Sequence, residues 1–374
     1  MKVLMILSKE ILTDDRVYRE AKALVEAGHE VAIIAWDRCG EYERESEIDG
    51  IKIFRIHNEG LMKILPNNLF RNPLWWKMAY RKGLDIYKSG FRFNVVHCHD
   101  LDTLLSGVWL KRKLKVRLIY DAHEIFGYMI SRDKPSVVVK SAFWMEKSLV
   151  KYVDYIITVS EILENYFKSF AGKPITVVMN CKNLVSDKYT PPNNDVFTVC
   201  YIGVLHKNRM FPELVDIIGN IEGVKFVIAG KKENLYDDVK KRCERYKNVK
   251  FLGAIPFSDV IPKTLKSDVV INMINPNDLN DRISLPNKLF EALVCGRPII
   301  TTKGTYVGEL AEKLRCGIAI DYDGESVKKA VELLRDNQNL REELGKNAFK
   351  AAKERYNWDE EKRNLLKVYR ELKD

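Results

Sequence analysis

Short runs of apolar and β-branched residues alternate with helical patterns along the whole chain, and this alternation narrows the folds open to it. Runs such as 3–7 and 31–35 are apolar throughout, with no polar residue at every second position. Strands that are apolar on both faces and separated by helices indicate parallel sheets covered by helices on each side. The sequence therefore predicts a doubly wound α/β architecture.

The expected strands fall into two groups. They are 3–7, 31–35, 51–55, 95–97, 118–120, 155–159 and 176–179, followed by 198–202, 225–229, 249–252, 269–273, 298–301 and 317–320. Between the groups, residues 183–195 break all periodicity and contain a Pro-Pro pair. A chain of 374 residues is long enough for two domains, taking roughly 100–200 residues for each. We expect an N-terminal Rossmann-like domain at 1–185 and a C-terminal one at 186–357.

The composition is that of a cytosolic protein without a membrane span. The seven cysteines include no C-x-x-C pair and several lie inside apolar runs, as expected of reduced thiols. Residues 1–7 are too few for the apolar region of a signal peptide, and no run reaches about 18 apolar residues. We therefore expect a cytoplasmic location. The net charge of +10 suits nucleic acid, an anionic membrane or an anionic ligand and does not decide among them.

Residues 284–301 contain the clearest local signal for a ligand site. Ser284 is expected to cap a helix whose first turn contains Pro286, and Gly296 is expected to end it. Free N–H groups and the positive end of the helix dipole would then lie beside Lys288, which favours an anion such as a diphosphate. Glu291, one turn later, is placed to accept hydrogen bonds from a ribose. The alternative for an isolated helix is that Lys288 and Glu291 form an ordinary surface pair.

These residues also carry a resemblance to a known family. The pattern P-x-K-x-F-E at 286–291, followed by G-R-P-I-I at 296–300, resembles the nucleotide-sugar-binding helix of the retaining glycosyltransferases of family 4. Further short motifs follow in the family's order: 14–17 (DDRV), 27–31 (AGHEV), 97–102 (HCHDLD), 120–124 (YDAHE), 201–203 (YIG) and 368–369 (VY). The resemblance implies a GT-B fold, with two Rossmann-like domains facing a central cleft and the C-terminal helix, 358–374, crossing back to the first domain.

By the same resemblance, the C-terminal domain binds a nucleotide diphosphate sugar as donor substrate, without a metal or other cofactor. The residues that match the family's donor site are Gly203, Lys207, Arg209, Pro286, Asn287, Lys288 and Glu291. Two positions depart from the family pattern. Val204 stands where many relatives have an arginine, and Ile283 stands where the first glutamate of an E-x7-E pair is frequent.

The N-terminal domain is expected to bind the acceptor. The resemblance assigns His99 and Asp100 to the catalytic centre, and the same reasoning adds Arg16, His123 and Glu124 as residues facing the cleft. His97 is expected in the core. Histidines at i and i+2 are expected to point to opposite faces of a strand, so that the two do not share a metal. Asp100-x-Asp102 matches a metal motif of a different glycosyltransferase fold, and we predict no metal.

Residues 61–93 combine seven basic residues, one acid and seven aromatic residues. A basic, aromatic helix of this kind binds an anionic membrane interface, which would make the protein peripheral on the inner face of the membrane. The alternative is a domain helix that packs its aromatic residues on the sheet. No nucleic-acid-binding module is visible, so nucleic acid is not expected as a partner.

The resulting expectation is a metal-independent glycosyltransferase that transfers a sugar, with retention, to a glycan, lipid-linked or small-molecule acceptor. Two alternatives stay open. Ile283 leaves room for a catalytically impaired homologue that only binds sugar nucleotides. A sugar-nucleotide epimerase shares the fold, but its paired carboxylates and histidines cannot be assembled from the sequence.

Overall fold

The computed structural model describes residues 1–58, 60, 68–233 and 235–373, and these form two compact units. Unit 1 comprises Met1–Met179 together with the C-terminal residues from Lys362, and unit 2 is Asn180–Glu361. The break falls a few residues before the one expected from the sequence. The Pro-Pro segment 183–195 lies within unit 2. There the carbonyl oxygen of Thr190 accepts a hydrogen bond from Nη1 of Arg297 at 2.9 Å.

Unit 1 is built on an eight-stranded sheet with the order β3-β4-β2-β1-β5-β6-β7-β8. Its strands are β1 (Lys2–Leu7), β2 (Glu30–Asp37), β3 (Glu45–Ile48), β4 (Ile51–His57), β5 (Val95–His99), β6 (Arg117–Ala122), β7 (Tyr155–Thr158) and β8 (Ile175–Val177). Its helices are α1 (Asp15–Glu26), α3 (Asn68–Lys88), α4 (Leu101–Leu114), α5 (Phe126–Ile130), α6 (Ser136–Leu149) and α7 (Glu161–Lys168). All neighbouring strands are parallel except β3 and β4, which confirms the doubly wound prediction for this unit.

The antiparallel edge strand β3 is the one strand of unit 1 outside the predicted set. Its turn into β4 is Asp49-Gly50, with φ of 51° and 77°. Two successive residues at positive φ are typical of a two-residue hairpin turn. The Asp49-Gly50 pair therefore indicates a hairpin in the sequence. The strand before it is hard to recognise, because it begins with the exposed Glu45.

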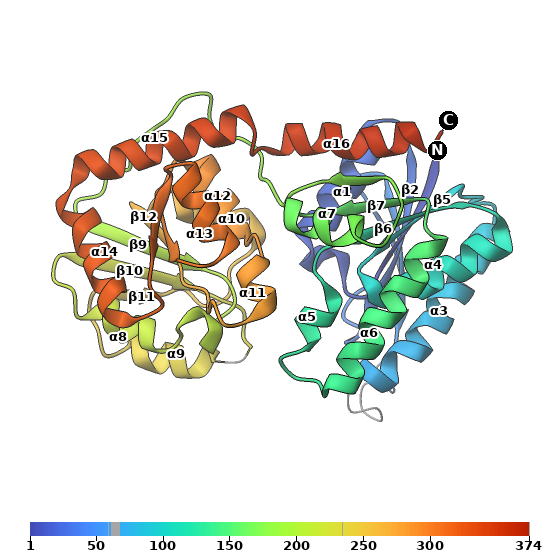
Figure 1. The fold of residues 1–374 in the computed structure, drawn as a ribbon, viewed down its shortest axis with the longest axis horizontal. Helices are drawn as coiled ribbons and strands as arrows, with labels where there is room; N and C mark the ends of the chain where they lie inside the picture. Colours follow the sequence, from blue (N-terminus) through green and yellow to red (C-terminus); the bar gives the residue numbers. More distant parts are fainter. Residues whose placement is uncertain (59, 61–67, 234, 374) are drawn as a thin grey trace. The chain divides into compact units, whose positions relative to one another are not determined.

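Helices α3, α4 and α6 lie together on one face of the sheet in Figure 1. The core there is apolar, and Trp36 of β2 stacks on Trp75 of α3 with ring centroids 4.9 Å apart. Helix α16 (Trp358–Glu371) begins in unit 2, and its later residues belong to unit 1. Its Tyr369 hydroxyl lies 2.8 Å from Nδ1 of His97. The predicted return of the last helix to the first domain is therefore present.

Unit 2 contains a six-stranded sheet with the order β11-β10-β9-β12-β13-β14, and every neighbouring pair is parallel. Its strands are β9 (Phe197–Ile202), β10 (Val224–Ala229), β11 (Val249–Phe251), β12 (Val269–Asn272), β13 (Ile299–Thr302) and β14 (Gly317–Ile320). Its helices are α8 (Glu213–Gly219), α9 (Tyr236–Cys243), α10 (Phe257–Leu265), α11 (Leu279–Ile283), α12 (Asn287–Cys295), α13 (Tyr306–Lys313), α14 (Gly324–Asp336) and α15 (Gln338–Glu354). Each strand of this unit matches a predicted run to within a residue or two. Among the described residues, no helix is long and apolar enough to cross a bilayer.

Candidate active site

The first group of candidate residues surrounds the N-terminus of helix α12 in unit 2. Pro286 is the residue before the first turn, and no side chain caps the helix. The expectation that Ser284 caps α12 is wrong, because Ser284 ends the preceding helix α11 and its hydroxyl donates to the carbonyl oxygen of Asp281 at 2.9 Å. Gly296 ends α12 in the left-handed conformation with φ of 60°, as predicted. The first N–H groups of α12 thus donate no hydrogen bond to the side chain of their N-cap residue.

Lys288 lies in the first turn of α12 and is 9 % exposed. Its ammonium lies 4.5 Å from the ring centroid of Tyr201. Burial and the nearby guanidinium of Arg209 lower the pKa of Lys288 to about 8. A buried ammonium held beside a second positive charge is stabilised by an anion, so this pair of cations favours a negatively charged ligand.

Gly203 follows strand β9 and permits the close approach of Lys288. A Cβ atom at this position would lie 2.6 Å from Nζ of Lys288, and the φ of 152° is one that other residues rarely adopt. Val204, which takes the place of an arginine in the family pattern, is 47 % exposed. Its carbonyl oxygen accepts a hydrogen bond from the Tyr201 hydroxyl. The glycine therefore keeps open the space that the lysine side chain uses.

Arg209 is also brought to this region, but with a partner that the sequence did not indicate. Its guanidinium forms a two-pronged ion pair with Asp281 of α11, and both N···O distances are 2.8 Å. Lys207 is exposed in the same short segment. Its carbonyl oxygen accepts from the Tyr322 hydroxyl at 2.9 Å. Arg209 and Lys288 thus share one site, and Asp281 has a defined role there as the anchor of Arg209.

Glu291 lies one turn after Lys288 and is 8 % exposed. Its carboxylate is 4.0 Å from the ammonium of Lys182, a residue that the sequence analysis did not select. Asn287, the first residue of α12, is exposed. All donor-site residues predicted from the sequence therefore lie in unit 2 at α12 or in the segment after β9.

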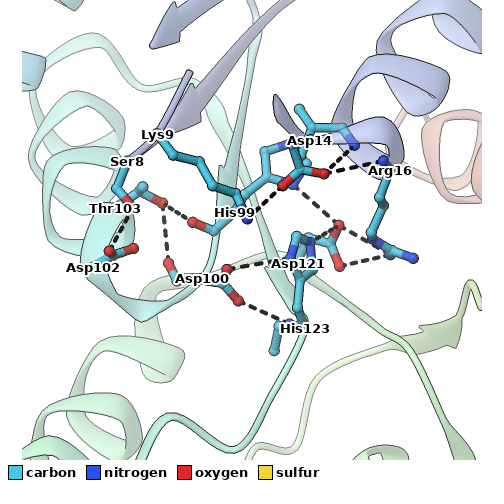
Figure 2. Close-up of polar contacts among 12 residues, drawn as sticks. Ser8, Lys9, Asp14, Arg16, His99, Asp100, Asp102, Thr103, Asp121 and His123 are labelled. Atoms are coloured by element: carbon cyan, nitrogen blue, oxygen red, sulfur yellow. Dashed lines mark hydrogen bonds and ion pairs between the residues drawn. The ribbon is translucent and has the colours of Figure 1, made fainter. Parts of the chain in front are cut away.

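The second group lies in unit 1, where strands β5 and β6 end. Figure 2 shows the side chains of His99, Asp100, Asp121 and His123 turned toward one another, with Arg16 of α1 reaching in from the side. The two oxygens of Asp121 accept from Nη2 of Arg16 at 3.1 and 3.2 Å. His123 lies 3.1 Å from Asp121 through Nε2 and 3.3 Å from Asp100 through Nδ1. The predicted unit 1 residues thus form a charged network, with the half-buried Glu124 next in sequence.

His97 and His99 face the same side of strand β5, and the expectation that they face opposite sides is wrong. Their rings are 4.4 Å apart and nearly parallel, since residues at i and i+2 share a face of a strand. Both rings point toward Asp121, with N···O distances of 3.7 Å for His97 and 3.3 Å for His99. His97 is fully buried and also contacts Tyr369, as expected of a core residue.

The ionisation of each residue in this network depends on its burial and on the charges beside it. Although burial opposes the ionised form, the charges of Arg16 and His123 hold the pKa of Asp121 well below its usual range. Asp100 and Asp121 overcome burial and raise the pKa of His123 well above its ordinary value. Burial, reinforced by His97, lowers the pKa of His99 to about 3. At neutral pH the His123 ring is therefore charged and the His99 ring is neutral.

The loop positions around the network are also constrained. Asp100 adopts a φ of 63°, which is uncommon for a residue other than glycine. Its backbone strain is offset by the hydrogen bond that its carboxylate accepts from the His123 N–H at 3.1 Å. Lys9, at the end of β1, forms a 2.7 Å ion pair with Asp14, which in turn caps α1. No sequence motif indicated Lys9 as a site residue, although a position just after a strand is typical of one.

Asp102, which shares the Asp-x-Asp pattern with Asp100, makes a contact of its own. It accepts from the Ser8 hydroxyl at 2.6 Å. Burial and the charge of Asp100 raise the pKa of Asp102 to about 6.

A different set of residues has the spacing of metal ligands. Among the described residues, Glu20, His97, His99 and Asp121 each offer a ligand atom within 4.8 Å of the others. The guanidinium of Arg16 already contacts this set, 2.9 Å from Glu20 and 3.1 Å from Asp121. An arginine between two carboxylates supplies the positive charge that a cation would otherwise bring. The residues present therefore fit an internal ion pair better than a metal centre.

Helix α3, for which the sequence left membrane binding and packing on the sheet open, packs on the core of unit 1. Trp75 of α3 is fully buried. The residues that pack on the core of unit 1 beside it are Trp76, Tyr80, Leu84, Tyr87 and Phe91. The aromatic side of α3 is thus unavailable to a membrane, which favours the alternative of a domain helix, while Lys77, Arg81 and Lys88 are exposed. Residues 61–67 lie outside the described residues.

Comparisons with known proteins match both units. Residues 15–184 match the family model described as Glycosyltransferase Family 4, and residues 196–337 match the model described as Glycosyl transferases group 1. Glycosyltransferase MJ1069 of Methanocaldococcus jannaschii, itself uncharacterised, is 24 % identical over 357 residues, which cover 88 % of this chain and 87 % of that protein.

Solved structures of glycosyltransferases show the same fold. Sucrose-phosphate synthase from Thermosynechococcus elongatus superposes with a TM-score of 0.78 at 16 % identity, covering 100 % of this chain and 99 % of that one. HepE from Anabaena, determined in complex with UDP-glucose, gives a TM-score of 0.72 at 14 % identity, covering 99 % and 100 %. Both units together therefore have the GT-B architecture.

Proposed function

Because this chain is a glycosyltransferase of the family 4, group 1 type, we propose that it transfers a sugar from a nucleotide diphosphate sugar bound at helix α12. The acceptor in this proposal is a glycan, a lipid-linked glycan or a small molecule, and the configuration at the anomeric carbon is retained. The solved relative HepE was crystallised with UDP and with UDP-glucose, so UDP-glucose is the first donor to test.

One observation carries the proposal: the buried ammonium of Lys288 stands at the uncapped start of α12, beside Arg209 and over Gly203. A helix N-terminus with two cations matches a diphosphate in charge and in hydrogen-bond geometry. Burial of the Lys288 ammonium carries an energetic penalty, which its lowered pKa reflects. A bound anion would remove that penalty.

In the transfer step, the bond between the anomeric carbon and the diphosphate breaks, and negative charge grows on the leaving oxygen. Lys288 and Arg209 would stabilise that charge in the transition state. Glu291 would accept hydrogen bonds from the ribose, as the family resemblance implies. The acceptor oxygen forms the new bond to the anomeric carbon and gives its proton to the departing phosphate, so no separate carboxylate base is required.

The network in unit 1 is assigned to the acceptor side of the reaction. The carboxylate of Asp100 is 29 % exposed and the His123 ring 13 %, whereas His99 is almost fully buried. Asp100 and charged His123 are therefore the members of the network that can reach a substrate. His99 would act behind them, by fixing Asp121 and through it the orientation of His123.

The proposal is tested by measuring donor binding and turnover together. In a thermal-shift screen of nucleotide diphosphate sugars, a donor at 100 times its dissociation constant adds about 2.7 kcal/mol of stability. The donor that binds should then yield free nucleotide diphosphate with an acceptor pool, and the yield should survive EDTA. Binding without release would favour a non-catalytic binding protein. Loss of activity in EDTA, restored by a divalent metal, would contradict the metal-free mechanism.

A further inference from the structure

Helix α6 of unit 1 presents large apolar side chains to solvent between lysines. Val137 is 75 % exposed and Trp144 is 72 % exposed. Lys140, Lys147 and Lys151 are also exposed. These five residues recur at intervals of three or four, so they lie along one side of the helix and its short 3-10 continuation. We refer to this set as the α6 face.

The opposite side of α6 packs on the core of unit 1 through Ala142 and Leu149. The single acid of the helix, Glu146, is fully buried. Its two oxygens accept from the hydroxyls of Tyr120 and Tyr166, at 2.8 and 2.7 Å. The helix therefore has no outward carboxylate of its own, and the exposed charges of the α6 face are all positive, with the Lys147 ammonium 5.3 Å from the ring centroid of Phe170.

The basic and aromatic character continues beyond the helix. Tyr152 is 44 % exposed, and the guanidinium carbon of Arg112 in α4 lies 5.6 Å from its ring centroid. Tyrosine and tryptophan rings prefer the boundary between water and lipid headgroups. The exposed Trp144 ring, with Lys140 and Lys147 on either side of it along the helix, is thus suited to that boundary.

We propose that the α6 face docks unit 1 on an anionic lipid surface. Trp144 and Val137 would enter the headgroup region, and the three lysines would contact lipid phosphates. A protein partner fits less well, because lysine is depleted in the cores of protein interfaces and the apolar side chains here are separated by charges. This surface is distinct from helix α3, whose aromatic side is in the core. The inference is independent of the donor site in unit 2.

The test is sedimentation of the full-length protein with vesicles of phosphatidylcholine alone or with equal parts phosphatidylglycerol. Wild type should pellet with the anionic vesicles at low salt, and binding should fall steeply as salt rises. Each lysine near an anionic surface strengthens binding by about fivefold. The triple variant Lys140→Glu, Lys147→Glu, Lys151→Glu should therefore lose on the order of a hundredfold or more in affinity.

Two matched controls separate the α6 face from general charge and from folding defects. Lys77→Glu, Arg81→Glu, Lys88→Glu makes the same charge change on α3 and should leave most binding intact. Trp144→Ala should weaken binding, whereas Leu333→Ala, at a residue 47 % exposed in unit 2, should not. The proposal is overturned if wild type does not bind anionic vesicles or if the α3 variant loses binding while the α6 variant keeps it. It is equally overturned if light scattering shows that Trp144 instead joins two copies of the chain.

Discussion

Asp281 holds Arg209 in a fixed orientation, with two N···O distances of 2.8 Å between guanidinium and carboxylate. Asp281 is 2 % exposed and also accepts from the amide of Asn208 at 3.2 Å. Because a two-pronged pair fixes the plane of the guanidinium, the arginine is oriented before any ligand arrives. The pair joins helix α11 to the segment after β9, and so it has both a structural and a binding role.

These two roles can be separated by a double variant. Arg209→Ala should destabilise unit 2 by roughly 3–5 kcal/mol, because it leaves the buried carboxylate of Asp281 without its cation. Arg209→Ala with Asp281→Asn should recover much of that stability. Affinity for nucleotide diphosphate should stay low in both variants, as measured by calorimetry on the folded double variant. Full affinity in the double variant would mean that Arg209 serves only the fold.

The lowered pKa of Lys288 predicts a pH-dependent affinity. Its pKa is about 8 in the free protein, and a bound diphosphate would raise it again. Below the free pKa both states are protonated and affinity is constant. As the pH rises past it, binding must take up a proton, so affinity should fall by up to about tenfold per pH unit.

Calorimetry in buffers of different ionisation enthalpy would detect that proton uptake directly. Lys288→Arg is the matched control, because an arginine stays charged through this range. It should bind without proton uptake and with a flatter pH profile. Equal proton uptake in wild type and Lys288→Arg would place the titrating group elsewhere.

Gly203 should tolerate no side chain. Gly203→Ala places a Cβ at a φ of 152° and 2.6 Å from the Lys288 ammonium, so the lysine must move. We expect a loss of about 1–3 kcal/mol in stability and weaker binding of nucleotide diphosphate. Gly304→Ala is the control, since Gly304 also has a positive φ but nothing lies near its Cβ position. If both variants bind alike, the contact with Lys288 is unimportant.

In unit 1, the charged state of His123 should contribute stability that depends on pH. A histidine whose pKa is raised by folding stabilises the folded state fully below its unfolded pKa of about 6.5. This stabilisation is lost as the pH rises through the folded pKa. His123→Gln should therefore destabilise unit 1 by about 3 kcal/mol in mildly acidic buffer and by less in alkaline buffer. Hydrogen exchange in β5 and β6 reports this unit alone. A destabilisation that does not vary with pH would exclude the ionic role.

The strand pattern was predictable because a parallel sheet buried on both faces leaves uninterrupted apolar runs. The edge strand β3 breaks this rule, since it is short and Ile48 is its one apolar residue. The order of elements also placed the site residues correctly after strands, where open α/β sheets bind ligands. The family resemblance is what brought Lys288 and Arg209 into one predicted donor site.

The sequence does not show which residues far apart along the chain contact each other. Asp281 is joined to Arg209 only by the fold, and the contact of Tyr369 with His97 spans 272 positions. The amphipathic pattern of α3 gave the side that is buried but not whether protein or lipid covers it. Ser284 looked like a cap because its residue type suits one, yet Pro286 already provides the extended residue before the helix.

A donor site at the start of α12 is tested most directly by calorimetric titration of UDP-glucose and UDP into wild type and the Lys288→Ala variant. Lys303→Ala is the matched control, because Lys303 is an exposed lysine of the same unit. We expect Lys288→Ala to bind both ligands more weakly by roughly 1.5–3 kcal/mol, and Lys303→Ala to bind as wild type does. Unchanged affinity in Lys288→Ala, with wild type binding both ligands, would contradict a donor site at the start of α12.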